Sequence, residues 1–171
     1  MPDAPARSGT RTDLESVFRE SYPLVVGVAA RVLGSRDQAE DVAQDVFLSF
    51  WRSAVPAGEA RGWLSVAAAH SALNLIRSGK RRALREQAVS GDTVVPDIAD
   101  AIVTDEERGI VRAALGRLPR KQAVALVLRH SGLSYADVAA ALDISPGSVG
   151  TTVRRAESAL RKELNRHASS E

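Results

Sequence analysis

Apolar residues recur at the three- and four-residue spacing of α-helices along most of this chain, and that periodicity constrains its fold more than any other feature. Val25, Val28 and Val32 belong to one such series, and Val42 and Val46 belong to another. No segment alternates apolar and polar residues as a strand does, and aromatic residues make up only 4% of the chain. We therefore predict an all-α fold.

Capping chemistry predicts where the helices begin, because a serine or threonine side chain can accept from the free N–H groups of a first turn. Pro119 and Pro146 are each predicted at a first helical position. Gly34 is predicted to end the first helix, and Pro23 predicts a kink or two shorter helices. The pairs with capping-box spacing are Thr12 with Glu15, Ser35 with Gln38, Thr104 with Glu107 and Ser134 with Asp137.

The order of these signals predicts two small helical domains joined by a flexible linker. Residues 12–86 form the first domain, with a Pro/Gly loop at 52–61 and a third helix over 62–82. Residues 87–103 contain Gly, Pro and scattered acids without a sustained period, so they are predicted as the linker. Residues 104–166 form the second domain. Disordered tails are expected at 1–11 and 167–171.

Several classes of protein are disfavoured by what the sequence lacks. There are no cysteines, which excludes disulfides, thiolate metal sites and cysteine nucleophiles. The first residues have no apolar core for a secretory signal, and no apolar run predicts membrane insertion, so a cytoplasmic location is expected. The three histidines are far apart, and no phosphate-binding loop or nucleophile motif occurs. We expect no catalytic residue, no metal site and no cofactor.

Charge is segregated along the chain although the formal net charge is only +2. Acidic residues are concentrated at 37–45 and again at 83–107, whereas bases are concentrated at 77–82 and 154–166. Segregation of this kind indicates several different binding partners along one chain.

The segment from Gly132 to Leu160 has the features of a helix-turn-helix. Ser134 begins a short helix, Asp143 and Ile144 supply the turn, and the second helix keeps Val149 and Val153 inside. Small hydroxyl residues and arginines on its outer face suit base edges and phosphates in a major groove. An ordinary helical hairpin with a solvated, arginine-rich face remains the alternative. The predicted DNA-binding residues are Ser145, Pro146, Gly147, Ser148, Thr151, Thr152, Arg154 and Arg155.

Three segments together resemble the extracytoplasmic-function group of sigma factors. SRDQAEDVAQDVFLSFW (35–51) resembles its polymerase-binding helix, WLSVAAAHSALNLIRSGKRR (63–82) its promoter-melting helix, and residues 114–164 its second DNA-binding domain. The resemblance implies a sigma factor whose region 2 (12–86) recognises and melts the −10 element and whose region 4 (104–166) recognises the −35 element. It implies RNA polymerase core and promoter DNA as partners. The β′ clamp coiled-coil would bind region 2 and the β flap would bind region 4, and an anti-sigma factor is a further candidate partner.

An acidic ridge carries the predicted polymerase contact. Asp37, Asp41 and Asp45 are spaced four residues apart, which aligns them on one side of a helix. Such a ridge beside apolar residues suits protein docking, although a solvated acidic face and a core position for Trp51 stay open. The predicted polymerase-binding residues are Asp37, Asp41, Gln44, Asp45, Leu48 and Trp51.

The third helix departs from the family where it should read the −10 element. The family has an Arg-Asn pair followed four residues later by Asp, whereas this chain has Ala69, His70 and Asn74. A surface histidine without a DNA contact is the alternative for His70. The loop 54–59 occupies the place where the family captures a flipped base. The predicted −10 contacts are His70 and Asn74 for bases and Arg77, Lys80, Arg81 and Arg82 for phosphates.

Three other classes of function are alternatives to a sigma factor. An enzyme lacks any recognisable site in this sequence. A stand-alone DNA-binding regulator would use only the helix-turn-helix and would shift duplex DNA without polymerase, whereas a sigma factor should need the core enzyme. A pure protein-interaction module would have no use for the DNA-reading face.

Overall fold

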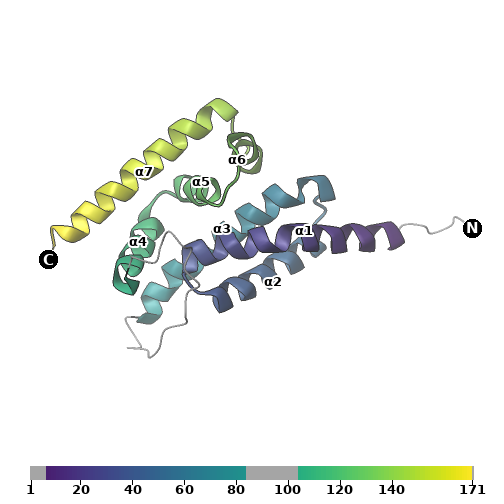
Figure 1. The fold of residues 1–171 in the computed structure, drawn as a ribbon, viewed down its shortest axis with the longest axis horizontal. Helices are drawn as coiled ribbons and strands as arrows, with labels where there is room; N and C mark the ends of the chain where they lie inside the picture. The colour runs from purple at the N-terminus through teal and green to yellow at the C-terminus, as the bar shows by residue number, and fades with distance from the viewer. Residues whose placement is uncertain (1–6, 84–103, 171) are drawn as a thin grey trace, which may run out of the picture.

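The computed structural model describes residues 7–83 and 104–170, and the regular structure within these ranges is helical (Figure 1). Side chains are described for residues 13–79 and 104–170. The all-α prediction is confirmed. The helices are α1 (Arg7–Leu33), α2 (Arg36–Arg52), the 3₁₀ turn η1 (Ala57–Glu59), α3 (Ala60–Ala83), α4 (Asp105–Arg117), α5 (Arg120–His130), α6 (Tyr135–Leu142) and α7 (Pro146–Ala168).

Three of the predicted helix caps are confirmed. At the start of α4, the Glu107 N–H donates to Thr104 Oγ1 at 3.2 Å and the Thr104 N–H donates to the Glu107 carboxylate at 2.8 Å. These bonds hold the pKa of Glu107 below its ordinary value, the backbone donor having the larger effect. Ser35 and Ser134 likewise accept from the backbone N–H three residues on, so the starts of α2 and α6 follow from local sequence.

The predictions for the first helix are partly wrong. α1 begins at Arg7 rather than at Thr12, and it continues through Pro23 as one helix instead of two. Pro23 lacks the N–H that would bond one turn back, which weakens a helix locally. Val17 and Val25 on either side of it are both buried in the same core, and this packing holds the two halves in line. Gly34 follows the helix with a φ of +68°, as its predicted role as a stop requires.

Smaller shifts occur at three other boundaries. Pro119 is the N-cap of α5 and not its first residue, whereas Pro146 does occupy the first turn of α7 as predicted. α3 begins at Ala60, two residues before the predicted start. α7 extends to Ala168, two residues past the predicted limit of 166, because adding residues to an existing helix costs far less than nucleating a new one.

The first three helices pack into a bundle through the faces that the periodicity predicted. Val28 of α1, Val46 of α2 and Leu64 of α3 are buried with at most 3% of their surface exposed. Phe50 of α2 packs against Trp63 of α3 with ring centroids 5.7 Å apart. This packing leaves the acidic ridge of α2, hereafter the α2 ridge (Asp37, Asp41, Gln44, Asp45, Leu48 and Trp51), on the outside of the bundle.

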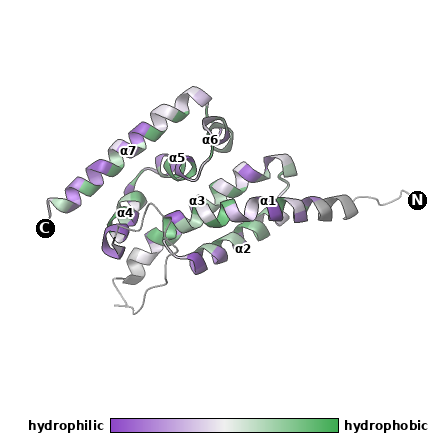
Figure 2. Ribbon diagram, viewed as in Figure 1, coloured by the Kyte–Doolittle hydropathy of each residue, from purple (hydrophilic) through white to green (hydrophobic). Residues whose placement is uncertain are grey.

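The helices α4 to α7 form a second bundle that contains the helix-turn-helix. Val138 of α6 and Val149 of α7 are fully buried where those two helices meet. Asp143 makes the turn between them in a left-handed conformation, with φ 53° and ψ 51°. In Figure 2, hydrophobic and hydrophilic residues alternate along α7, consistent with one buried and one exposed face.

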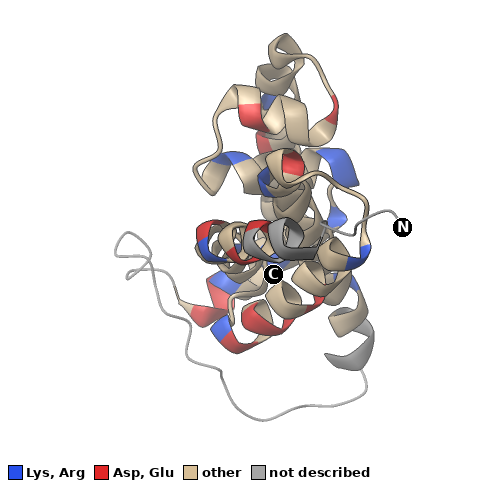
Figure 3. Cartoon of the chain, turned by 90° about the vertical axis from the view of Figure 1, so that its right-hand side faces the viewer, with Lys and Arg blue, Asp and Glu red and all other residues tan. Residues whose placement is uncertain are grey.

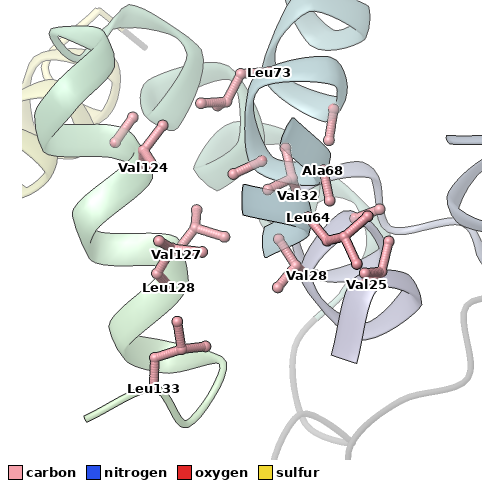
Figure 4. Close-up of a cluster of buried hydrophobic side chains, with 14 of the residues drawn as sticks. Val25, Val28, Val32, Leu64, Ala68, Leu73, Val124, Val127, Leu128 and Leu133 are labelled. Carbon is pink, nitrogen blue, oxygen red and sulfur yellow. The ribbon is translucent and has the colours of Figure 1, made fainter. Parts of the chain in front are cut away.

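The two bundles lie against each other, with α4, α5 and α6 all in contact with α3 (Figure 1). Their buried side chains belong to one continuous hydrophobic cluster. Figure 4 shows Leu73 of α3 together with Val124, Val127 and Leu128 of α5 in this cluster. The linker predicted at 87–103 lies outside the described residues. No described helix is both long enough and apolar enough to cross a membrane.

Candidate polymerase and nucleic-acid interfaces

The α2 ridge is exposed along its whole length. Val42, Val46 and Phe50 point into the bundle, so with 3.6 residues per turn the ridge lies on the opposite side of the helix. This arrangement leaves the ridge available to another molecule. The exposed residues of the ridge are Asp37, Asp41, Gln44, Asp45, Leu48 and Trp51.

Apolar side chains on the ridge are unusually open to solvent. Leu48 is 45% exposed and Trp51 is 49% exposed, so the alternative that Trp51 belongs to the core is wrong. Asp41 and Asp45 form no hydrogen bond or ion pair with another residue whose side chain is described. Large apolar groups beside unpaired carboxylates are typical of a docking surface rather than of a merely solvated helix face.

Phe18 of α1 is a further exposed aromatic residue, and it packs against α2. Its side chain is 40% exposed. Its ring packs 4.9 Å from Phe47 of α2 and 4.9 Å from Tyr22, centroid to centroid. The helical periodicity alone could not separate Phe18 from its buried neighbours, because it lies at the edge of the apolar stripe.

The three described −10 candidates lie on one face of α3 and are exposed, but they are not free. The Arg120 side chain donates to Asn74 Oδ1 at 2.5 Å and to the His70 carbonyl oxygen at 3.1 Å. The Arg77 side chain donates to the carbonyl oxygens of Gly116 and Leu118, at 2.9 and 3.2 Å. The Asn74 and Arg77 side chains, both predicted to meet DNA, therefore contact α4, α5 and the turn between them, whereas His70 does so through its backbone carbonyl group.

Positive charge is concentrated where α3 meets α4 and α5, because Arg77 and Arg120 lie close together there. Burial and the nearby Arg120 lower the pKa of His70. Burial and the nearby Arg77 lower the pKa of Arg120. Within the described part of the chain, neither arginine forms an ion pair with a carboxylate. Among the residues whose side chains are described, both guanidinium groups therefore bond to neutral acceptors.

Other −10 candidates are positioned only in part. Ala69, where the family has arginine, is fully buried and does not reach the surface. Lys80, Arg81 and Arg82 continue α3, but their side chains lie outside the described ones. In the loop 54–59, the backbone forms the turn η1 and most residues are exposed.

A groove of about 460 Å³ separates α2, α3 and α6 near these groups. Asp45 and Ser49 line it from α2, Trp63 and His70 line it from α3, and Ala141 lines it from α6. One predicted polymerase contact and one predicted DNA contact therefore meet at the same depression.

The recognition helix α7 presents the predicted DNA-binding face. The buried side of α7 contains Val149, Val153 and Ala156. The first turns of α7, at the top of Figure 3, contain no charged residue. Thr152 is only half-buried, and its hydroxyl donates to the Ser148 carbonyl oxygen at 2.8 Å. The exposed members of the predicted set are Ser145, Pro146, Gly147, Ser148, Thr151, Arg154 and Arg155.

Two residues beside α7 were not singled out from the sequence. Arg129 stacks over the Tyr135 ring at 4.9 Å from its centroid and donates to the Leu133 carbonyl oxygen at 3.2 Å. Tyr135 is 47% exposed at the start of α6. A polar aromatic tip next to a recognition helix suits a phosphate contact, but no spacing rule would have identified it.

Comparison with known families matches both bundles. The family described as Sigma-70 region 2 matches residues 17–82, and Sigma-70, region 4 matches residues 108–160. The ECF RNA polymerase sigma factor SigK of Mycolicibacterium vanbaalenii is 31% identical over 173 residues, covering 95% of this chain and 88% of that protein. The chain belongs to the ECF sigma factors.

Other relatives of this ECF sigma factor are consistent with that membership. The RNA polymerase sigma-H factor of Pseudomonas aeruginosa is 31% identical over 157 residues, covering 82% of this chain and 80% of that one. The sigma factor RpoE from Bartonella quintana, solved in complex with the anti-sigma factor NepR, is 23% identical. Its TM-score of 0.50 over 92% of this chain and 97% of that chain indicates a shared fold.

Proposed function

We propose that this ECF sigma factor binds RNA polymerase core through the α2 ridge and reads promoter DNA with α3 and α7. One observation carries the proposal: the chain has an exposed acidic and apolar ridge on α2 and a separate exposed hydroxyl and arginine face on α7. A stand-alone regulator would need the second surface but not the first.

The α2 ridge fits a basic partner surface with apolar pockets. Its carboxylates would steer and orient the encounter, while Leu48 and Trp51 would supply buried contact area. We assign its partner as the coiled-coil of the β′ clamp, which the family membership implies. The β flap would contact region 4.

Promoter contacts divide between two elements. α7 would enter the major groove of the −35 element, with Thr151 near base edges and Arg155 at a phosphate. α3 would hold the opening strand at the −10 element through His70, Asn74 and Arg77, together with the basic run 80–82. The loop 54–59 would receive a flipped base.

Membership in the ECF sigma factors also supports the proposed domain limits, cellular location and further partner. Region 2 spans 12–86, the linker 87–103 and region 4 104–166, although α1 begins before and α7 ends after these limits. Sigma factors are not enzymes, so the polymerase performs the chemistry, and we place the protein in the cytoplasm with it. An anti-sigma factor is a proposed partner, as in the RpoE complex with NepR.

Run-off transcription with purified core polymerase on a promoter library tests this function. We expect transcripts from a defined subset of promoters only when the chain and the core enzyme are both present. A gel shift of duplex DNA by the chain alone, with no effect on core polymerase, would instead support a stand-alone regulator.

A further inference from the structure

We propose that two glycines of the recognition helix, Gly147 and Gly150, let α7 lie close enough to the bases for Thr151 to contact the C5 methyl group of a thymine in the −35 element. The inference rests on the proposed function of α7. It goes further by naming the base that is read and the residues that set the distance of approach.

Neither glycine is required by the packing of the protein itself. A Cβ atom placed on Gly147 would meet nothing within 4 Å, and one placed on Gly150 would lie 3.8 Å from Tyr135 Cε2, an ordinary contact distance. Both residues lie in helical backbone, so no left-handed conformation calls for glycine. Glycine inside a helix is nevertheless destabilising relative to alanine. This loss of stability without a gain in packing indicates that the space beside the two glycines serves a second molecule.

The space lies on the side of α7 that is predicted to face DNA. Val149 and Val153 are buried, and with 3.6 residues per turn Gly147 and Thr151 lie on the opposite side of the helix. Thr151 is exposed there. Gly147 is one turn before Thr151 in the same line, and Gly150 immediately precedes it, so no side chain shields Thr151 on these two sides.

The residue types in this part of α7 favour contact with thymine. In the major groove, guanine is read by Arg or Lys, adenine by Asn or Gln, and cytosine by Asp or Glu. Thymine presents a methyl group, which the methyl group of a threonine can contact. Residues 145–152 contain none of the six residue types that read the other bases, and the first turns of α7 are uncharged in Figure 3. Thymine is therefore the base whose distinguishing group has a partner here.

Most hydroxyl groups in the same stretch already have partners within the protein. The Ser145 and Ser148 hydroxyl groups lie 2.6 Å apart and bond to each other. The Thr152 hydroxyl donates to the Ser148 carbonyl oxygen at 2.8 Å. Contact between methyl groups needs no hydroxyl, so Thr151 can read a thymine without breaking any of these bonds.

Deoxyuridine substitution tests the contact, because deoxyuridine is thymidine without the C5 methyl group and pairs with adenine in the same way. The holoenzyme is titrated against a promoter that the run-off assay identifies, with each −35 thymine replaced in turn. We expect one position to weaken binding about fourfold, the value for one buried methyl group. Equal affinity for all the substituted promoters would overturn the thymine contact, as would a −35 element with no thymine on either strand.

Two variants of Thr151 separate its methyl group from its hydroxyl group. Thr151→Val keeps a methyl group and loses the hydroxyl, whereas Thr151→Ser keeps the hydroxyl and loses the methyl group. We expect Thr151→Val to discriminate between thymine and deoxyuridine as the wild type does, and Thr151→Ser to bind both promoters equally. The reverse result would mean that the hydroxyl group reads the base, and it would overturn the inference.

Gly150→Ala tests the close approach, and Gly109→Ala is its matched control. Each glycine is the fifth residue of its helix, and a Cβ atom on Gly109 of α4 would meet nothing within 4 Å. We expect both changes to raise the Tm of the free protein by about 1–4 °C, and only Gly150→Ala to weaken binding of the holoenzyme to the −35 element. Unchanged promoter affinity of Gly150→Ala, or a Tm below that of the wild type, would contradict the role of this glycine.

Failure of the inference and failure of the proposed function give different results. Exchanging −35 base pairs for other base pairs should weaken holoenzyme binding if α7 reads this element at all. Sensitivity to exchanged base pairs without sensitivity to deoxyuridine would overturn the thymine contact alone. Insensitivity to both changes would reject the proposed function of α7.

Discussion

Reversing two charges on the α2 ridge should separate polymerase binding from folding. The change is Asp41→Arg with Asp45→Arg. Both side chains are exposed and form no ion pair within the described chain, while the neighbouring Val42 and Val46 that support the helix are untouched. Exposed substitutions of this kind change the free energy of unfolding by about 0.5 kcal/mol or less.

The expected loss of polymerase affinity is larger than that. Disrupting a charge pair that is desolvated at an interface costs about 2–5 kcal/mol. At 1.4 kcal/mol per tenfold, this corresponds to a rise in Kd of roughly 30-fold to 4,000-fold. A carboxylate that only faces solvent near the partner would contribute about 0.2–1 kcal/mol, or less than about fivefold.

Fluorescence titration with core polymerase measures this difference, and circular dichroism verifies that the helices remain. The matched control is Asp13→Arg with Glu20→Arg, two exposed acids of α1 that give the same change in net charge. We expect the ridge variant to lose at least tenfold more affinity than the control. Equal affinities for the two variants would refute the assignment of the ridge.

Three further predictions concern DNA and pH. Thr151→Ala should cost about 1–3 kcal/mol at particular base pairs of the −35 element, whereas Arg155→Ala should weaken all sequences alike and flatten the salt dependence, as filter binding with holoenzyme can measure. His70→Ala with Asn74→Ala should abolish permanganate-reactive thymines while closed-complex binding persists, and equal opening by both proteins would move −10 readout elsewhere, first to the loop 54–59. Arg120→Ala should raise the pKa of His70 toward its ordinary value of 6.5 in an NMR titration, because one of the two causes of the lowering is removed. Because folding lowers the pKa of His70, its contribution to the free energy of unfolding should be fully present above pH 6.5 and be lost progressively as the pH falls below that value, and an unchanged titration in the variant would contradict the contact.

Local chemistry made much of the fold predictable. The Thr104–Glu107 capping box and the turn before Pro146 are set by residues within a few positions of one another, and each occurs where the sequence indicated. The exposed α2 ridge was also predictable. The helical period of 3.6 residues places its carboxylates on one side of α2 and the buried Val42 on another. The prediction of a kink or break at Pro23 was wrong, because packing on both sides of this residue outweighs the local destabilisation that proline causes in a helix.

The contact between α3 and α4–α6 had no comparable signal. The helical spacing predicts that Leu73 is buried, but it does not indicate whether the first or the second bundle covers it. Arg120 follows a proline at a helix start, and nothing in its neighbours indicates that its partners are 46 and 50 positions away. Long-range contacts of this kind depend on how two finished bundles fit together, which local pattern does not encode.

Strand opening on a single promoter fragment is the most direct test of the account. Permanganate reactivity of the −10 thymines is measured with the chain alone, with core polymerase alone and with both together. We predict reactive thymines only in the third reaction, and we predict their loss when the charges of the α2 ridge are reversed. Reactive thymines without polymerase, or an unchanged pattern after the ridge is reversed, would contradict the claim that this protein works by delivering polymerase to promoter DNA.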